Sequence, residues 1–194
     1  QNNQEVFNML NTKYFIINGQ DGNPTSQRNP AALGNAWFVN NFIMVNDANA
    51  EIDSLNGFDP AGDAIIHAEF KDYIAGIKPS KNGLITLKSY TPNKLEYESN
   101  TQGDQLAVFS EIWYGPNKGW QAYIDGQAVD HIRANYVLRA MKVPSGKHTI
   151  VFEFKPKAYY LGETISLICS GILLALLVWV IFSAYKKEKQ ASIA

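Results

Sequence analysis

One uncharged stretch near the C-terminus limits what this chain can be. Residues 165–185 contain 21 residues and no charged side chain. A helix of that length measures about 31 Å at about 1.5 Å per residue, which matches the roughly 30 Å hydrocarbon core of a bilayer. A helix in the core of a soluble protein normally keeps one polar face, whereas the polar residues here are mainly small hydroxyls. The stretch therefore predicts a membrane-spanning helix.

The rest of the chain is long enough for one folded body. About 160 residues precede the stretch, which is sufficient for a domain with a sizeable core. We predict a β-sandwich domain over residues 1–160, a transmembrane helix over 161–186 and a basic tail over 187–194. The chain opens at Gln1 without an initiator Met or a secretion signal. It is therefore expected to be either a tail-anchored protein or a fragment of a longer one.

The composition excludes some functions and favours a class of fold. The net charge is −1, from 17 Lys and Arg against 18 Asp and Glu, so nothing in the charge favours a nucleic-acid partner. Aromatic residues make up 12% of the chain, and such residues are enriched in strands. The only cysteine, Cys169, lies inside the uncharged stretch. The soluble part therefore has no disulfide and no thiolate chemistry.

Short strand-sized segments separated by turn residues fill most of the soluble part. Two short helices are expected, over residues 5–10 (capped by Asn2 or Asn3) and 47–55, and residues 19–30 are expected to form a surface loop. Asp125-Gly126 is a strong two-residue hairpin signal. The predicted strands are residues 13–18, 37–45, 64–70, 84–90, 94–99, 105–113, 120–125, 128–133, 136–143 and 148–155. This pattern predicts a mainly β fold, an antiparallel, jelly-roll-like β-sandwich with one or two short helices.

No catalytic or metal-binding motif stands out. The histidines His67, His131 and His148 fall in three different predicted strands, and the carboxylates form no recognisable pair. We therefore predict no catalytic residue, no metal site and no cofactor. One aromatic and basic group is a candidate for weak ligand binding, through stacking on a sugar ring or docking onto a larger membrane protein. Packing in the sandwich core is the alternative. The aromatic and basic group consists of Trp113, Tyr114, Trp120, Tyr123, Arg133 and Arg139.

The second half of the chain resembles a known family. A run of turn and packing residues, followed by an apolar helix, is similar to the C-terminal end of the bacterial YfhO membrane protein family. Residues 9–14 and 29–37 also resemble segments of that family. The matching positions are Gly119-Trp120, Asp125-Gly126, Asn135-Tyr136, Arg139-Ala140, Val143-Pro144, Gly146 and His148.

The resemblance implies a role within a larger membrane protein. The family is similar to polytopic glycosyltransferases of the GT-C kind, which use lipid-phosphate-linked sugars, and their acidic catalytic residues are expected in loops among upstream helices. This chain would then be a non-catalytic accessory domain that orients a cell-envelope glycan acceptor. Its partners would be the membrane, the upstream helices and the glycan. It would sit on the bacterial plasma membrane, on the periplasmic or cell-surface side, with the basic tail in the cytoplasm.

Two other interpretations stay open. The β-sandwich can be purely structural, bracing the transmembrane region or binding a protein without any ligand. Full burial of Trp113, Trp120 and Tyr123 would favour that interpretation over sugar contact. A stand-alone tail-anchored hydrolase is the third, and it would need a carboxylate pair or a Ser/His pair that converges in a cleft.

Overall fold

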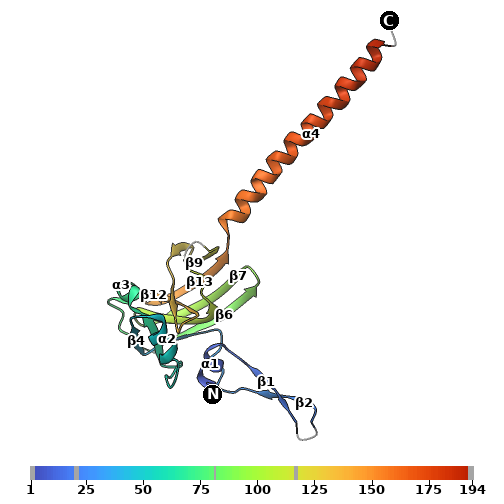
Figure 1. The fold of residues 1–194 in the computed structure, drawn as a ribbon. Helices are drawn as coiled ribbons and strands as arrows, with labels where there is room; N and C mark the ends of the chain where they lie inside the picture. Colours follow the sequence, from blue (N-terminus) through green and yellow to red (C-terminus); the bar gives the residue numbers. More distant parts are fainter. Residues whose placement is uncertain (1–2, 20–21, 81, 116–117, 192–194) are drawn as a thin grey trace. The chain divides into compact units, whose positions relative to one another are not determined.

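The computed structural model describes residues 3–19, 22–80, 82–115 and 118–191 (Figure 1). The chain divides into two compact units, Gln1–Lys155 and Pro156–Ala194. The first holds the strands and the short helices, and the second is the long helix α4 (Lys157–Ala191). The prediction of a mainly β fold with short helices and a C-terminal apolar helix is confirmed.

Two antiparallel sheets form a sandwich in the first unit. One has the strand order β10-β9-β13-β7-β6 and the other β11-β12-β8-β3. The core between them is aromatic: the ring of Phe109 lies 5.0 Å from that of Tyr97 and 4.9 Å from that of Phe152, edge to face. The strands are β3 (Ala36–Phe38), β6 (Gly83–Thr91), β7 (Lys94–Thr101), β8 (Gln105–Ile112), β9 (Trp120–Ile124), β10 (Gln127–Val129), β11 (Ile132–Ala134), β12 (Leu138–Val143) and β13 (Gly146–Phe154).

A third layer covers the other face of the four-stranded sheet. It contains the parallel pair β4 (Asn41–Val45) and β5 (Asp63–His67), with helix α2 (Ala48–Ser54) between them in the chain and the short helices η1 (Ala68–Phe70) and α3 (Lys71–Ile74) after them. Strand β8 is therefore buried on both faces. Leu106 and Val108 join the core under this layer, while Phe109 faces the sandwich core. The sequence pattern did not predict this layer, because a strand buried on both faces shows no alternation.

Two predicted strands prove to be pairs of strands in different sheets. Residues 37–45 divide into β3 and β4, because the chain leaves the four-stranded sheet at Val39 and Asn40 donates its backbone N–H to the Gly62 carbonyl at 2.6 Å. Residues 128–133 divide into β10 and β11, which lie in the two sheets of the sandwich. In both segments the chain changes sheets at polar residues, Asn40 in the first and Asp130 and His131 in the second.

The N-terminal segment carries a hairpin that the sequence did not predict. Helix α1 (Gln4–Met9) confirms the expected helix, and the Asn3 side chain accepts a hydrogen bond from the Val6 N–H at 3.4 Å. Asn2, the alternative cap, lies outside the described residues. Residues 19–30, expected to be a loop, contain β2 (Pro24–Arg28), which pairs with β1 (Tyr14–Asn18). Every residue of β2 is exposed, so no apolar alternation marked it as a strand.

Helix α4 is long and apolar enough to cross a membrane from Lys157 to Lys186. Its apolar side chains are exposed along this length, and so is Cys169. The boundaries predicted at 161–186 and 187–194 remain predictions, and residues 192–194 lie outside the described part of the chain.

Candidate functional site

One end of the sandwich holds a cavity of about 440 Å³. Clefts of about 300–1,000 Å³ commonly bind small molecules. The walls come from the β6–β7 turn, the C-terminal ends of β8 and β13, the N-terminal ends of β9 and β12, and Tyr114 and Lys118 between β8 and β9. Its lining residues are Pro92, Asn93, Glu111, Ile112, Tyr114, Lys118, Trp120, Arg139 and Phe154. We call this cavity the end pocket.

Three aromatic rings line the end pocket. Strand alternation turns Trp120 inward, and it pairs across the sheet with Phe154, whose ring centroid lies 5.4 Å away. Trp120 is half-buried, and the side chain of Tyr114 is 58% exposed. Tyr114 therefore offers the freest aromatic face in this pocket.

Arg139 is unusual for a charged residue, because it is only 1% exposed. Its guanidinium carbon lies 4.1 Å from the centroid of the Trp120 ring and 5.2 Å from that of Phe152. Nε donates to the Ile112 carbonyl at 2.9 Å. The buried Nη1 has no hydrogen-bond partner among the described residues. Burial lowers the pKa of Arg139, and the carboxylate of Glu111 opposes that effect.

Glu111 adds a carboxyl group to the same pocket. Burial raises the pKa of Glu111, and the positive charge of Arg139 works in the opposite direction. Nearby, burial and then the charge of Arg139 lower the pKa of His131 to about 4, so His131 is neutral at neutral pH. Arg139 and Glu111 therefore bring opposite charges to one partly apolar pocket.

The structure divides the six predicted ligand residues among three places. Tyr114, Trp120 and Arg139 line the end pocket. Trp113 and Arg133 lie together elsewhere, with the guanidinium carbon 5.9 Å from the centroid of the indole ring.

The cluster around Arg133 is a buried ionic network. Arg133 Nη2 lies 2.9 Å from Glu51 Oε2, and Glu51 is fully buried. The other oxygen of Glu51 accepts the Tyr136 backbone N–H at 3.0 Å. These contacts tie helix α2 to β11 and the turn after it, so the network holds the third layer against the sandwich.

Tyr123 lies apart from both groups. It alternates with the inward-facing Trp120 and Ala122 along β9 and so projects from the outer face of the five-stranded sheet. Its hydroxyl donates to Gln121 Oε1 at 2.6 Å. Trp113, Trp120 and Tyr123 are all half-buried, so burial alone does not separate sugar contact from a structural role.

The sequence did not single out several residues of the pocket. Asn93 and Lys118 lie in turns, which carry no chemical pattern. Phe154 stood out only as part of an apolar strand face. Glu111 was one carboxylate among many, and only the β8 register places it beside Arg139.

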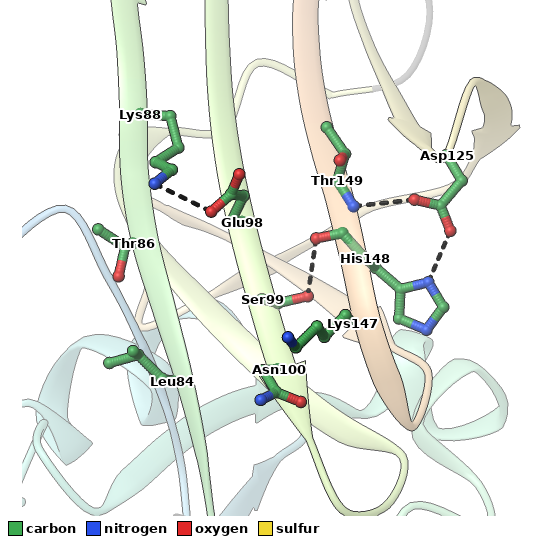
Figure 2. Close-up of a pocket in the computed structure, with 10 residues that line it drawn as sticks. All are labelled: Leu84, Thr86, Lys88, Glu98, Ser99, Asn100, Asp125, Lys147, His148 and Thr149. Atoms are coloured by element: carbon green, nitrogen blue, oxygen red, sulfur yellow. Dashed lines mark hydrogen bonds and ion pairs between the residues drawn. The ribbon is translucent and has the colours of Figure 1, made fainter.

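The outer face of the five-stranded sheet carries a second, more polar hollow of about 460 Å³, shown in Figure 2. Four of its charged side chains form two pairs within the protein: Lys88 Nζ lies 2.9 Å from Glu98 Oε2, and His148 Nδ1 lies 2.6 Å from Asp125 Oδ2. His148 Nε2 lies 3.1 Å from the Ser145 carbonyl. An acceptor at each ring nitrogen favours the charged imidazolium, and these contacts tie the β9–β10 turn to β13.

The ionisation of that pair follows from its hydrogen bonds. The bond to the Asp125 carboxylate, and then the bond to the Ser145 carbonyl, raise the pKa of His148. The bond from His148, and then the bond from the Thr149 backbone N–H, lower the pKa of Asp125.

Within the described ranges, no three His, Cys, Asp or Glu side chains gather as metal ligands would.

Comparison with known proteins identifies the family. The model of the bacterial membrane protein YfhO matches residues 64–166, more than half of the 194 residues. The chain belongs to the YfhO family. Together with the apolar helix α4, this makes it a membrane protein. No curated protein matches it, and no solved structure does.

The YfhO match includes the positions from Gly119 to His148 on which the resemblance was based, whereas residues 9–14 and 29–37 lie outside the matched range. Asp125, Asn135 and Tyr136 all have positive φ, at 51°, 49° and 70°. Asn135 is fully buried, and its side-chain oxygen accepts the Ile65 N–H at 2.8 Å. These residues shape the backbone, whereas Trp120 and Arg139 of the same match line the end pocket.

Proposed function

We propose that the β-domain of this YfhO-family protein is a non-catalytic accessory domain that binds a cell-envelope glycan in its end pocket. It would orient the acceptor for a glycosyltransferase-like site in the membrane-embedded part of a larger protein. The domain would lie on the extracytoplasmic side, anchored through α4. The observation that supports this most is the combination of an exposed aromatic ring with polar side chains in one cavity.

The pocket has the composition that sugar recognition requires. A sugar ring presents apolar C–H faces and a rim of hydroxyl groups, so it needs an aromatic surface and planar polar partners. Tyr114 offers the aromatic surface. Glu111, Asn93 and Arg139 offer an acceptor, an amide and a set of donors in the same cavity. The Arg139 guanidinium covers one face of the Trp120 ring. Trp120 would therefore position the guanidinium as well as line the pocket.

A titration of the full chain in lipid nanodiscs with neutral oligosaccharides tests this proposal. Saturation-transfer NMR should detect binding. Tyr114→Ala should weaken it about tenfold, since losing the contact of one aromatic ring costs about 1–2 kcal/mol. Tyr14→Ala is the matched control, because Tyr14 is 62% exposed but lies in β1. Absence of binding to any of the sugars, or equal effects of the two variants, would rule out the sugar site.

A structural or protein-interaction module is the second candidate, and the β1–β2 hairpin favours it. Ile16 and Tyr14 in β1 are 81% and 62% exposed, although a lone two-stranded hairpin is at best marginally stable in water. Exposed apolar side chains of this kind mark surfaces that contact a partner. Under this alternative, Ile16→Ser would impair assembly with the membrane-embedded part, and the Tyr114→Ala variant would behave like the wild type.

A further inference from the structure

Arg139 is an anomaly that sugar binding alone does not explain. A neutral glycan needs hydrogen-bond donors, but it does not need a permanent charge that is 1% exposed. Taking a charged group out of water is costly unless it is paired. Among the residues that the structure describes, no carboxylate forms an ion pair with this guanidinium, and only Nε has a hydrogen-bond acceptor.

The surroundings hold the guanidinium in place rather than neutralise it. The centroid of the Trp120 ring lies 4.1 Å from its central carbon, and that of the Phe152 ring lies 5.2 Å away. Aromatic faces attract cations but leave the N–H groups without acceptors. The guanidinium is therefore fixed at the wall of the pocket with unused hydrogen-bonding capacity. Such a group suits a ligand that supplies oxygen acceptors and negative charge, which guanidinium binds through paired hydrogen bonds.

We infer that the end pocket takes an acidic glycan unit, a sugar that bears a carboxylate or phosphoryl group, and that Arg139 pairs with the anionic oxygens. Tyr114 would cover the sugar ring, and Lys118 would add a second positive charge at the exposed rim. Because the anion belongs to a glycan, the assignment rests on the sugar-binding function proposed above.

Glu111 sets the selectivity of this arrangement. Its carboxyl group lines the same pocket, so its negative charge opposes an incoming anion and favours a neutral hydroxyl group. Arg139 and Lys118 together outweigh it by one charge. Removing the charge of Glu111 should therefore strengthen the binding of acidic sugars relative to that of neutral sugars.

The experiment compares three probes of similar size on the full chain in nanodiscs: methyl glucoside, glucuronate and glucose 6-phosphate. At neutral pH and low salt, at least one acidic probe should bind tenfold or more tightly than methyl glucoside. A preference for glucuronate identifies a carboxylate ligand, and a preference for glucose 6-phosphate identifies a phosphoryl ligand. Binding of all three with equal affinity would overturn the acidic-sugar assignment but leave the sugar site intact. Binding of none would overturn both.

Two variants link the result to the residues. Arg139→Met replaces a buried charge by an apolar chain of similar length, which buried sites usually tolerate. It should remove the preference for acidic probes, so that they bind no more tightly than methyl glucoside does to the same variant. Glu111→Gln should bind the preferred acidic probe about fivefold more tightly than the wild type. If Glu111→Gln weakens that probe, or if Arg139→Met keeps the preference, the assignment is wrong. Circular dichroism confirms that each variant is folded.

Discussion

Replacing Glu51 by Ala should destabilise the β-domain more than breaking any ion pair on its surface. Glu51 is fully buried and binds Arg133 at 2.9 Å and the Tyr136 N–H at 3.0 Å. Removing one partner of a buried ion pair typically costs about 3–5 kcal/mol. The Arg133 side chain is 23% exposed, so water partly compensates it, and we expect about 3 kcal/mol.

Thermal unfolding of the full chain in detergent micelles measures the effect. For a domain of this size, about 3 kcal/mol lowers the Tm by about 6–12 °C. Lys88→Ala is the control, because it breaks an ion pair of the same length between half-exposed side chains, and it should cost less than about 1 kcal/mol. A double-mutant cycle with Arg133→Ala isolates the pairwise energy. Equal losses for Glu51→Ala and Lys88→Ala would refute the assignment of a structural network.

Three further predictions concern the Asp125–His148 pair, the sandwich core and the orientation in the membrane. The stabilising contribution of His148 is complete below its ordinary pKa of 6.5 and is lost as the pH rises through its raised value, so the Tm difference between wild type and His148→Gln should shrink from pH 6 to pH 9. Phe109→Ala should cost about 3–5 kcal/mol in urea unfolding, because Phe109 is fully buried between two rings. Protease added to intact spheroplasts should digest the β-domain; protection would place it in the cytoplasm.

The sequence predicted most strands of the sandwich because their signals are local. Asp125-Gly126 forms the expected tight turn. Ile150 and Phe152 share the buried face of β13, as their alternation indicates. The third layer was missed for a physical reason: β4 and β5 pair in parallel through α2, and the residues that fix this layer are a buried Glu51 and a distant Arg133, 82 positions apart. No local pattern reveals such a pair.

The candidate site was predicted only in part for a related reason. Residues that are neighbours in the sequence belong to different clusters. Trp113 lies beside Arg133, whereas Tyr114 lines the end pocket. Residues distant in sequence came together, as Trp120 and Arg139 do. An aromatic and basic composition indicates that contacts of this kind form, but the strand register decides which residues form them.

The position of Arg139 within β12 is the strongest internal indication that the end pocket has a function. Along this strand the residues that face the sandwich core are Arg139, Met141 and Val143, and the last two belong to the buried apolar cluster. A leucine or methionine in place of Arg139 would continue that apolar face and avoid burying a charge. A residue whose chemistry conflicts with its place in the fold is most often explained by function. Bracing a membrane helix does not explain this buried charge, whereas the binding of an anionic group that we propose for the end pocket does.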